Sequence, residues 1–208
     1  MQRIEIRQEE RPGSLRDRKR DRTRRAIQTE ALRLFAKKGF QATTIEEIAA
    51  AADVAPRTFF RYFPTKEEVV FWSEYQPMLG SYVASRPDGE SAPEALRHGI
   101  VDGLTAFYDE DRDRLLERLM LAFRTPPLRP RLWQQQAAWA VGVGGILAER
   151  LHARADDLEV RAIAAAISAV LWVAVEEWQA QDGKGDLRVL LDRALGIVLA
   201  GSLLTTRP

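Results

Sequence analysis

The side chains best suited to chemistry stand in the stretch 56–66, where arginines are interleaved with aromatic residues. Arg57 and Arg61 are four residues apart, about one turn of an α-helix. A guanidinium group can donate two hydrogen bonds to a guanine base or to a phosphate. A helix over about residues 56–62 is too short to stand alone, so one face must pack on its neighbours. The other face is then left for recognition.

The preceding residues predict a first helix and a tight turn that position this segment. Thr43 or Thr44 can cap that helix, since each is followed three residues later by a glutamate, the spacing of a capping box. Asp53 falls where the turn needs a positive φ, which Asp tolerates better than most residues other than glycine. Pro56 suits the first turn of the second helix, where its missing N–H costs nothing. The stretch 43–69 therefore indicates a helix-turn-helix.

Residues 43–69, TTIEEIAAAADVAPRTFFRYFPTKEEV, resemble the helix-turn-helix of the TetR family of transcriptional repressors. The upstream segment LFAKKGFQATT, residues 34–44, resembles the end of the family's first helix and its glycine turn. The resemblance covers residues 17–70, about a quarter of the chain. It implies that the second helix of the motif enters the major groove of operator DNA. The matching positions are Thr44, Ile48, Ala49, Val54, Thr58, Phe59, Tyr62, Phe63 and Lys66.

The resemblance and the side-chain chemistry together assign roles in DNA binding. Arg57 and Arg61 are expected to contact base edges, and Thr58 a base, a thymine methyl or a phosphate. Tyr62 and Lys66 match family positions that hold backbone phosphates. Thr44, directly before the first helix of the motif, matches a family position that contacts a phosphate at a helix start, where free N–H groups favour anions. The full predicted set is Thr44, Arg57, Thr58, Phe60, Arg61, Tyr62 and Lys66.

The three phenylalanines of the second helix are expected to divide between two tasks. Phe59 and Phe63 should pin the short helix to its neighbours. The family often has tyrosine at the position of Phe60, and phenylalanine lacks the hydroxyl for a phosphate bond. Stacking on a sugar or a methyl group remains available to Phe60.

Three residues depart from the family's pattern. Asp53 replaces the usual turn glycine, and Ala55 replaces the usual capping serine, so one N–H at the helix start loses its partner. Arg57 stands where small residues are common. These departures leave the fold assignment intact and leave open which bases are contacted.

Charge is distributed unevenly along the chain. Residues 1–66 carry 16 basic and 9 acidic side chains, a net charge of +7, whereas residues 67–208 carry 15 and 21, a net charge of −6. The density of positive charge peaks over residues 16–25, with seven basic and two acidic residues. Such a segment is either the solvated start of a helix or a set of phosphate contacts, which supply affinity without sequence information. A basic head on an acidic body favours phosphate contact.

The hydrophobic periodicity predicts an all-α protein of about nine helices. We expect a disordered polar tail over residues 1–15, a three-helix DNA-binding domain over 16–66 and a helical ligand-binding and dimerisation domain over 67–208. The other expected helices are 17–38, one that follows Pro64 and is kinked by Pro77, one from 91 past Phe107, and 111–123, 129–153, 156–181 and 186–204.

Several functional classes are disfavoured by the residues. The chain has no cysteine, which excludes disulfides and thiolate chemistry and fits a reducing cytoplasm. No nucleophile with a paired base and no phosphate-cradling glycine loop is recognisable, so we predict no enzyme, no catalytic residue and no cofactor. The two histidines, His98 and His152, lack the spacing of a metal site, and no metal is expected. Charged residues interrupt each apolar run, so no membrane-spanning segment is predicted.

A ligand pocket in the second domain is expected from its aromatic residues and methionines, although each alone is more often core. Together they favour a small apolar or aromatic effector over a sugar or a nucleotide. The stretch FWSEYQPML, residues 71–79, resembles a TetR subgroup with acyl-CoA-like ligands. The candidate ligand-binding residues are Trp72, Tyr75, Phe107, Met120, Phe123, Trp139 and Trp172.

The resemblance also implies a homodimer. The last two helices carry apolar sets that would form a four-helix bundle with a symmetry mate, or alternatively an ordinary core within one chain. The function expected is a ligand-responsive repressor whose effector shifts the spacing of two recognition helices and releases DNA. An activator of the same fold, or a helical scaffold without specific DNA binding, remains an alternative.

Overall fold

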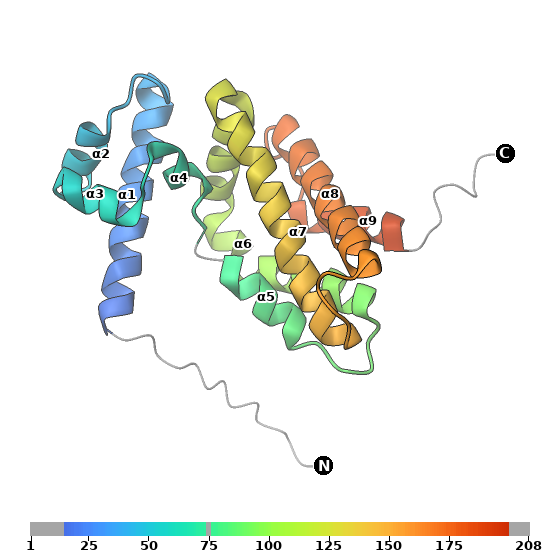
Figure 1. The fold of residues 1–208 in the computed structure, drawn as a ribbon. Helices are drawn as coiled ribbons and strands as arrows, with labels where there is room; N and C mark the ends of the chain where they lie inside the picture. Colours follow the sequence, from blue (N-terminus) through green and yellow to red (C-terminus); the bar gives the residue numbers. More distant parts are fainter. Residues whose placement is uncertain (1–14, 74–75, 200–208) are drawn as a thin grey trace, which may run out of the picture. The chain divides into compact units, whose positions relative to one another are not determined.

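The computed structural model describes residues 15–73 and 76–199, and over these residues it is built of helices without strands (Figure 1). There are nine α-helices and one short 3-10 turn in this part of the chain, which confirms the all-α prediction. The chain divides into two compact units, Met1–Thr65 and Lys66–Pro208, here called the first and the second unit. The expected boundary lay at residues 66 and 67.

The first unit holds three helices around an aromatic core. They are α1 (Leu15–Lys38), α2 (Ile45–Ala51) and α3 (Pro56–Tyr62). α1 ends before Gly39, whose φ of +87° is a conformation that glycine adopts without strain. The rings of Phe35 and Phe40 pack with their centroids 4.9 Å apart on the two sides of this turn. The apolar residues buried in this unit are Ile27, Ala31, Leu32, Phe35, Phe40, Ile48, Ala49, Phe59 and Phe63.

The second unit holds the remaining helices. A short helix α4 leads into it, and the long helices α6, α7, α8 and α9 form its body (Figure 1). Their bounds are α4 (Lys66–Phe71), α5 (Gln76–Ala84), α6 (Ala92–Arg124), the 3-10 turn η1 (Pro126–Leu128), α7 (Arg129–Leu151), α8 (Leu158–Ala180) and α9 (Leu187–Leu199).

Two expected helix boundaries were wrong. The helix predicted to kink at Pro77 is instead two helices, α4 and α5, and Pro77 is the second residue of α5, where proline is tolerated. The helices predicted on either side of residue 110 are one continuous α6 of 33 residues. The charged run 109–114 does not break it, because no proline or glycine occurs between Gly103 and Arg124.

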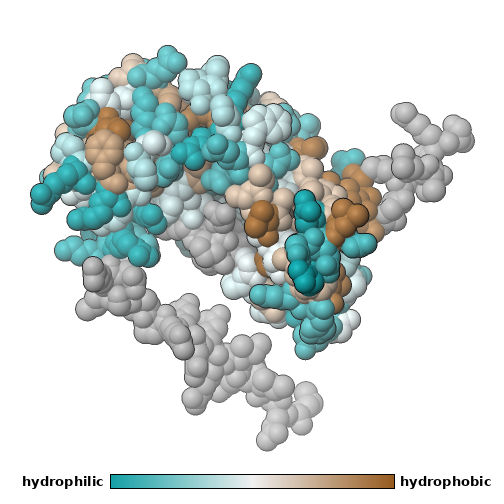
Figure 2. Space-filling view, in the orientation of Figure 1, coloured by the Kyte–Doolittle hydropathy of each residue, from teal (hydrophilic) through white to brown (hydrophobic). Residues whose placement is uncertain are grey.

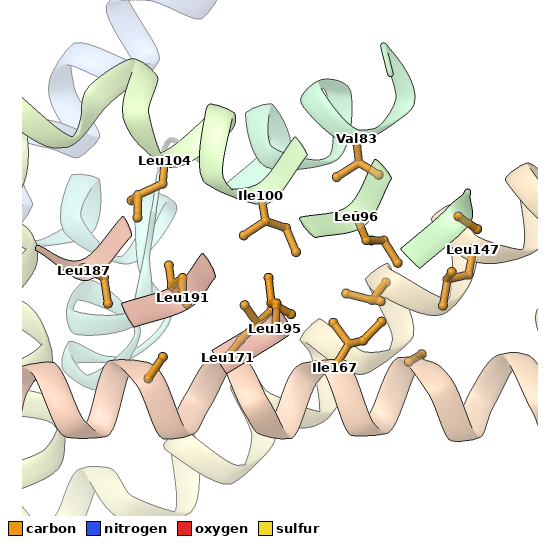
Figure 3. Packing of buried hydrophobic residues seen from close by; sticks show 14 of the residues in the cluster. Val83, Leu96, Ile100, Leu104, Leu147, Ile167, Leu171, Leu187, Leu191 and Leu195 are labelled. Carbon is orange, nitrogen blue, oxygen red and sulfur yellow. The ribbon is translucent and has the colours of Figure 1, made fainter. Parts of the chain in front are cut away.

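The core of the second unit is formed by residues of α5, α6, α7, α8 and α9 (Figure 3). Leu96 and Ile100 of α6, Ile167 of α8, and Leu191 and Leu195 of α9 point toward one another in this view. All five side chains are buried, and Leu147 of α7, which packs against α8, belongs to the same buried cluster. This framework of long helices fixes the walls of the cavity described below.

One helix bears on the expectation that no segment spans a membrane. α8 has 23 residues and a most apolar window of mean hydropathy 1.9, which is long and apolar enough to cross a membrane by length and composition alone. The longest charge-free stretch of α8, residues 162–175, has 14 residues, so every window of membrane-spanning length in this helix includes charged side chains. A third of the window, 33%, is buried in the fold, where α8 packs between α7 and α9.

Candidate DNA interface and effector cavity

The short helix α3 is held by its buried face. Phe59 is fully buried and Phe63, which directly follows the helix, is nearly so, as expected. The rings of these two residues lie with centroids 5.9 Å apart. Pro56 occupies the first turn, and Ala55 makes no side-chain cap. Packing rather than capping therefore determines where α3 lies.

The opposite face of α3 presents cations and an aromatic ring to solvent. Arg57 and Arg61 are exposed, and Phe60 between them is 50% exposed. The Arg61 guanidinium carbon lies 5.1 Å from the centroid of the Tyr62 ring, a cation–π contact that orients both side chains. Arg57, Phe60 and Arg61 thus share one surface, with Thr58 and Tyr62 half-buried beside it.

Two contacts from α1 tie down the end of α3. Arg24 Nη2 donates a hydrogen bond to the backbone oxygen of Tyr62 over 3.4 Å. The Arg24 guanidinium carbon also lies 5.8 Å from the centroid of the Phe63 ring. Farther toward the start of α1, the basic residues Lys19, Arg20 and Arg22 are exposed.

Of the two candidate caps of α2, Thr44 is the one used. Its Oγ1 accepts a hydrogen bond of 3.2 Å from the backbone N–H of Glu47, and its own N–H donates to the Glu47 carboxylate over 2.9 Å. Thr43 is buried instead and donates from Oγ1 to the Gly39 oxygen over 2.8 Å. The exposed Thr44 hydroxyl accepts the cap and still has a proton to donate to an anion.

The charges around this cap are coupled. The Glu47 carboxylate forms an ion pair with Lys38 at the end of α1. The hydrogen bond from Lys38, followed by that from the backbone of Thr44, lowers the pKa of Glu47 from 4.5 to about 2. The pair therefore links α1 to α2 at neutral pH. Asp53, in the turn before α3, has the expected positive φ of 53°.

The remaining predicted DNA contact belongs to the second unit. Lys66 is the first residue of α4 and is half-buried. It follows Thr65, the last residue of the first unit, directly in the chain.

A cavity of about 190 Å³ lies within the second unit. Aliphatic and aromatic side chains dominate its wall, and they come from five helices, α4, α6, α7, α8 and α9. The apolar residues of the wall are Val70, Phe71, Ile100, Leu104, Phe107, Leu115, Leu119, Ala122, Leu132, Trp139, Leu171, Trp172, Val175, Leu187 and Leu191. Figure 3 shows the inner end of this wall, where Leu104 and Ile100 approach Leu187 and Leu191.

Four polar residues interrupt the apolar wall, namely Ser73, Arg118, Gln135 and Ser168. Arg118 of α6 donates from Nη1 to the backbone oxygen of Trp72 over 2.5 Å. Gln135 of α7 donates from Nε2 to the backbone oxygen of Phe71 over 3.4 Å. The buried Ser168 of α8 donates to the backbone oxygen of Gln136 over 2.9 Å. Both donors on α6 and α7 thus bind the C-terminal end of α4.

The structure brings three of the seven candidate ligand-binding residues into this wall, Phe107, Trp139 and Trp172. Phe123 packs behind it, with its ring centroid 5.8 Å from that of Trp172. Trp72 does not line the cavity, but its backbone oxygen accepts a hydrogen bond from the lining residue Arg118. Met120 is not among the lining residues of the described chain, and Tyr75 lies outside the described residues.

The sequence did not predict the aliphatic and polar residues of the cavity wall, because the candidate residues were chosen among aromatic residues and methionines. A usable signal exists in α6, where Leu104, Phe107, Leu115, Arg118 and Ala122 recur at intervals of three, four or eight residues. This spacing marks one face of an unbroken helix. The expectation of a break near residue 110 concealed it.

A second apolar surface covers the outer faces of the last two helices. Leu158 and Val173 of α8 are 72% and 62% exposed, and Val189 of α9 is 64% exposed. Alanines of α8 fill the stripe between Leu158 and Val173, and they are exposed at positions 162, 165, 166 and 169. In Figure 2 apolar side chains of this unit reach the surface over α7 and α8.

The sequence matches the models of two protein families. The description of bacterial regulatory proteins of the TetR family matches residues 27–71. The description of the MftR C-terminal domain matches residues 90–203, more than half of the chain. Both compact units are therefore covered by family matches.

Two curated proteins match nearly the whole chain. The HTH-type transcriptional regulator TcmR of Streptomyces glaucescens is 33% identical over 212 residues, which cover 95% of this chain and 88% of that protein. The putative mycofactocin biosynthesis transcriptional regulator MftR of Mycobacterium tuberculosis is 28% identical over 88% of this chain and 93% of its own length.

Solved structures share the fold. The Thermus thermophilus FadR, a TetR family transcriptional repressor in complex with lauroyl-CoA, is 27% identical and has a TM-score of 0.58, with coverage of 89% of this chain and 97% of that one. The SmeT–triclosan complex has a TM-score of 0.61 at 18% identity, and covers 86% of this chain and 91% of that one.

Proposed function

Since this chain belongs to the TetR family of transcriptional regulators, we propose that it is a repressor that leaves its operator when a small apolar or aromatic effector fills the cavity of its second unit. The observation that carries the proposal is the division of α3 into two faces. Phe59 is buried beneath the helix, and Arg57 and Arg61 are exposed on the other side. A helix held in this way can enter the major groove of duplex DNA.

The contacts with DNA divide by chemistry. Arg57 and Arg61 contact base edges, where arginine binds guanine with two hydrogen bonds. Tyr62 and Lys66 bind backbone phosphates. The half-exposed ring of Phe60 makes an apolar contact with a sugar or a thymine methyl, and Thr58 contacts a neighbouring base or phosphate.

Thr44 adds a phosphate contact at the start of α2. Its exposed hydroxyl accepts the capping bond of that helix and has a proton left to donate. Free N–H groups at a helix start also favour an anion. Phosphate contacts of this kind fix the register of the protein on the duplex.

A homodimer through α8 and α9 places two copies of α3 on one operator. The exposed apolar residues of these helices, among them Leu158, Val173 and Val189, would be buried in a four-helix bundle with the partner. A two-fold dimer reads half-sites about 34–36 Å apart, one turn of DNA. A change in that spacing lowers the affinity for the operator.

The size of the cavity favours a compact effector. Its volume of about 190 Å³ exceeds the roughly 150 Å³ of an apolar cavity that binds benzene. It is below the roughly 300–1,000 Å³ of pockets for drug-sized ligands. An aromatic ring system fits these limits. An acyl-CoA, the ligand of the related FadR, is the other candidate and requires the cavity to widen for the acyl chain.

α4 is the element through which effector binding in the cavity influences the DNA-binding unit. Val70 and Phe71 of α4 line the cavity, and the same helix begins at Lys66, directly after the first unit. An effector that displaces α4 therefore acts on the start of the connection to the helix-turn-helix.

Binding of the purified protein to the DNA upstream of its own gene tests this function. The assay is run at two salt concentrations with random DNA as competitor. Retention of the specific fragment by a dimer, and its release by an aromatic compound, is the expected result. If binding is weak and salt abolishes it equally on every sequence, the protein is not a sequence-specific repressor of this gene.

A further inference from the structure

The C-terminal end of α4 is held by two side chains of the cavity wall. Arg118 donates to the backbone oxygen of Trp72 over 2.5 Å, and Gln135 donates to that of Phe71 over 3.4 Å. These donors come from α6 and α7, about 46 and 64 residues away in the chain. Two separate helices therefore converge on one short helix end.

The end of α4 depends on such donors. The last four carbonyl oxygens of any helix have no partner within the helix. In a helix of six residues, Lys66–Phe71, that leaves most of the carbonyls to be satisfied from outside. A helix this short is also unstable without tertiary contacts. Loss of the two donors is thus expected to loosen α4.

The same two donors are exposed to whatever occupies the cavity, because both residues line it. Arg118 is the charged residue among the described residues of the wall. A guanidinium binds a carboxylate through two parallel charge-assisted hydrogen bonds, which are stronger than one bond to a neutral carbonyl. An anionic ligand therefore competes with the carbonyl oxygens of α4 for Arg118, and a purely apolar ligand does not.

We propose that Arg118 and Gln135 form a latch on α4, and that the effector is an aromatic carboxylate whose acidic group draws these side chains away from Trp72 and Phe71. The proposal rests on the proposed effector cavity and assigns its ligand class and its trigger. The aromatic part packs between Trp139 and Trp172, and the carboxylate provides the signal. A neutral ligand of the same shape fills the cavity and leaves the latch closed.

A third tether of α4 supplies the matched control. Arg131 of α7 donates from Nη2 to the Glu68 carboxylate over 3.0 Å, and both side chains are more than a third exposed. Arg131 does not line the cavity. A half-exposed ion pair contributes little to stability, so its removal should change α4 only slightly.

The first experiment measures amide hydrogen exchange in the full-length variants Arg118→Leu, Gln135→Leu and Arg131→Leu without ligand. The reporter is the C-terminal end of α4, where the Trp72 N–H bonds to the Glu68 oxygen over 3.0 Å. Arg118→Leu should exchange there on the order of tenfold faster than wild type, the effect of one lost charge-assisted bond. Gln135→Leu should show a smaller increase and Arg131→Leu almost none. Amides of α8 and α9 should stay unchanged, which shows that the fold is intact.

The second experiment adds 2-naphthoate or the neutral 2-ethylnaphthalene and follows binding by tryptophan fluorescence. Both compounds should bind the wild type, and only 2-naphthoate should accelerate exchange in α4. Arg118→Leu should weaken 2-naphthoate by about tenfold or more and leave 2-ethylnaphthalene within about twofold. Arg131→Leu should bind both as the wild type does.

The outcomes separate the latch from the effector cavity. Binding of 2-naphthoate without faster exchange in α4, or equal effects of the two compounds, overturns the latch and leaves the effector cavity in place. Unchanged exchange in ligand-free Arg118→Leu also overturns the latch, whether or not either compound binds. If neither compound binds while Arg118→Leu loosens α4, the tether is supported and the aromatic effector is wrong.

Discussion

Phe59 and Arg57 are separated by one residue in α3, and the helix turns them to opposite sides. Phe59 is fully buried, whereas Arg57 is exposed. The phenylalanine therefore contributes to the position of the helix and the arginine to what it recognises. Substitutions at the two positions should affect different measurements, stability for the first and base preference for the second.

Arg57→Ala should weaken binding to the operator by about 1–3 kcal/mol and relax the preference at one base, because a bidentate contact to a base edge is lost. Lys66→Ala should instead weaken binding to all sequences evenly and lower the salt dependence, as expected of one phosphate contact. Affinities are measured for both variants on the selected operator and on random duplexes at several salt concentrations. Equal losses on both kinds of DNA for both variants would refute this division of roles.

Glu47 should make the stability of the first unit sensitive to acid. Its pKa falls from 4.5 to about 2 on folding, so the folded state releases this proton more readily than the unfolded state. The stabilisation is complete above about pH 4.5 and is lost as the pH falls towards about 2. Glu47→Gln retains a capping side chain and lacks the charge. Thermal melts should show a deficit of the variant at neutral pH that disappears below about pH 2; a deficit independent of pH would show that the charge is unimportant.

At the scale of elements, the sequence predicted those helices whose ends carry local signals. The capping box at Thr44 and Pro56 mark the starts of α2 and α3. Ser91 likewise marks the start of α6, where its hydroxyl accepts from Glu94. The continuity of α6 past residue 110 could not be seen, because a run of charges resembles a loop unless the tertiary contacts on both sides are known.

The buried face of α3 could be predicted from the sequence, whereas the composition of the cavity wall could not. Phe59 and Phe63 were expected in the core because the short helix must be pinned to its neighbours, and they are buried there. The cavity wall comes from five helices, so its composition depends on tertiary packing that no single stretch encodes. Arg118 and Gln135 became recognisable only through their bonds to the carbonyls of α4.

The crossing of α5 and α6 depends on Gly99. A Cβ atom there would lie 2.6 Å from the Cα of Val83 and 2.8 Å from its backbone nitrogen, so Gly99→Ala forces the two helices apart. We expect a loss of about 1–3 kcal/mol in the free energy of unfolding, the usual cost of overpacking. Gly142 of α7 has no atom within 4 Å of its added Cβ. Gly142→Ala should therefore stabilise by about 0.5–1 kcal/mol. Urea unfolding followed by circular dichroism compares the two, and a neutral Gly99→Ala would argue against the close approach.

At the scale of the whole molecule, the apolar outer face of α8 supports assembly. Val173→Glu should shift the dimer toward monomer, because a charge would be buried in the proposed four-helix bundle. Val141→Glu on α7 is the matched control, since Val141 is 77% exposed and lies outside the proposed interface. Sedimentation velocity at several protein concentrations reads out the mass. Dissociation by Val141→Glu alone would place the interface on α7 instead.

The two compact units each have an apolar core of their own, one that supports α3 and one whose residues partly line the cavity. A substitution that reshapes the cavity wall therefore acts on the second core and leaves the support of α3 intact. Selection can change the chemical signal to which such a protein responds without rewriting the DNA sequence it reads. Relatives at 33% or 28% identity can have diverged in one specificity and retained the other. Recombination of gene segments at the junction between Thr65 and Lys66 would then join an existing DNA-binding domain to a domain that binds a different effector.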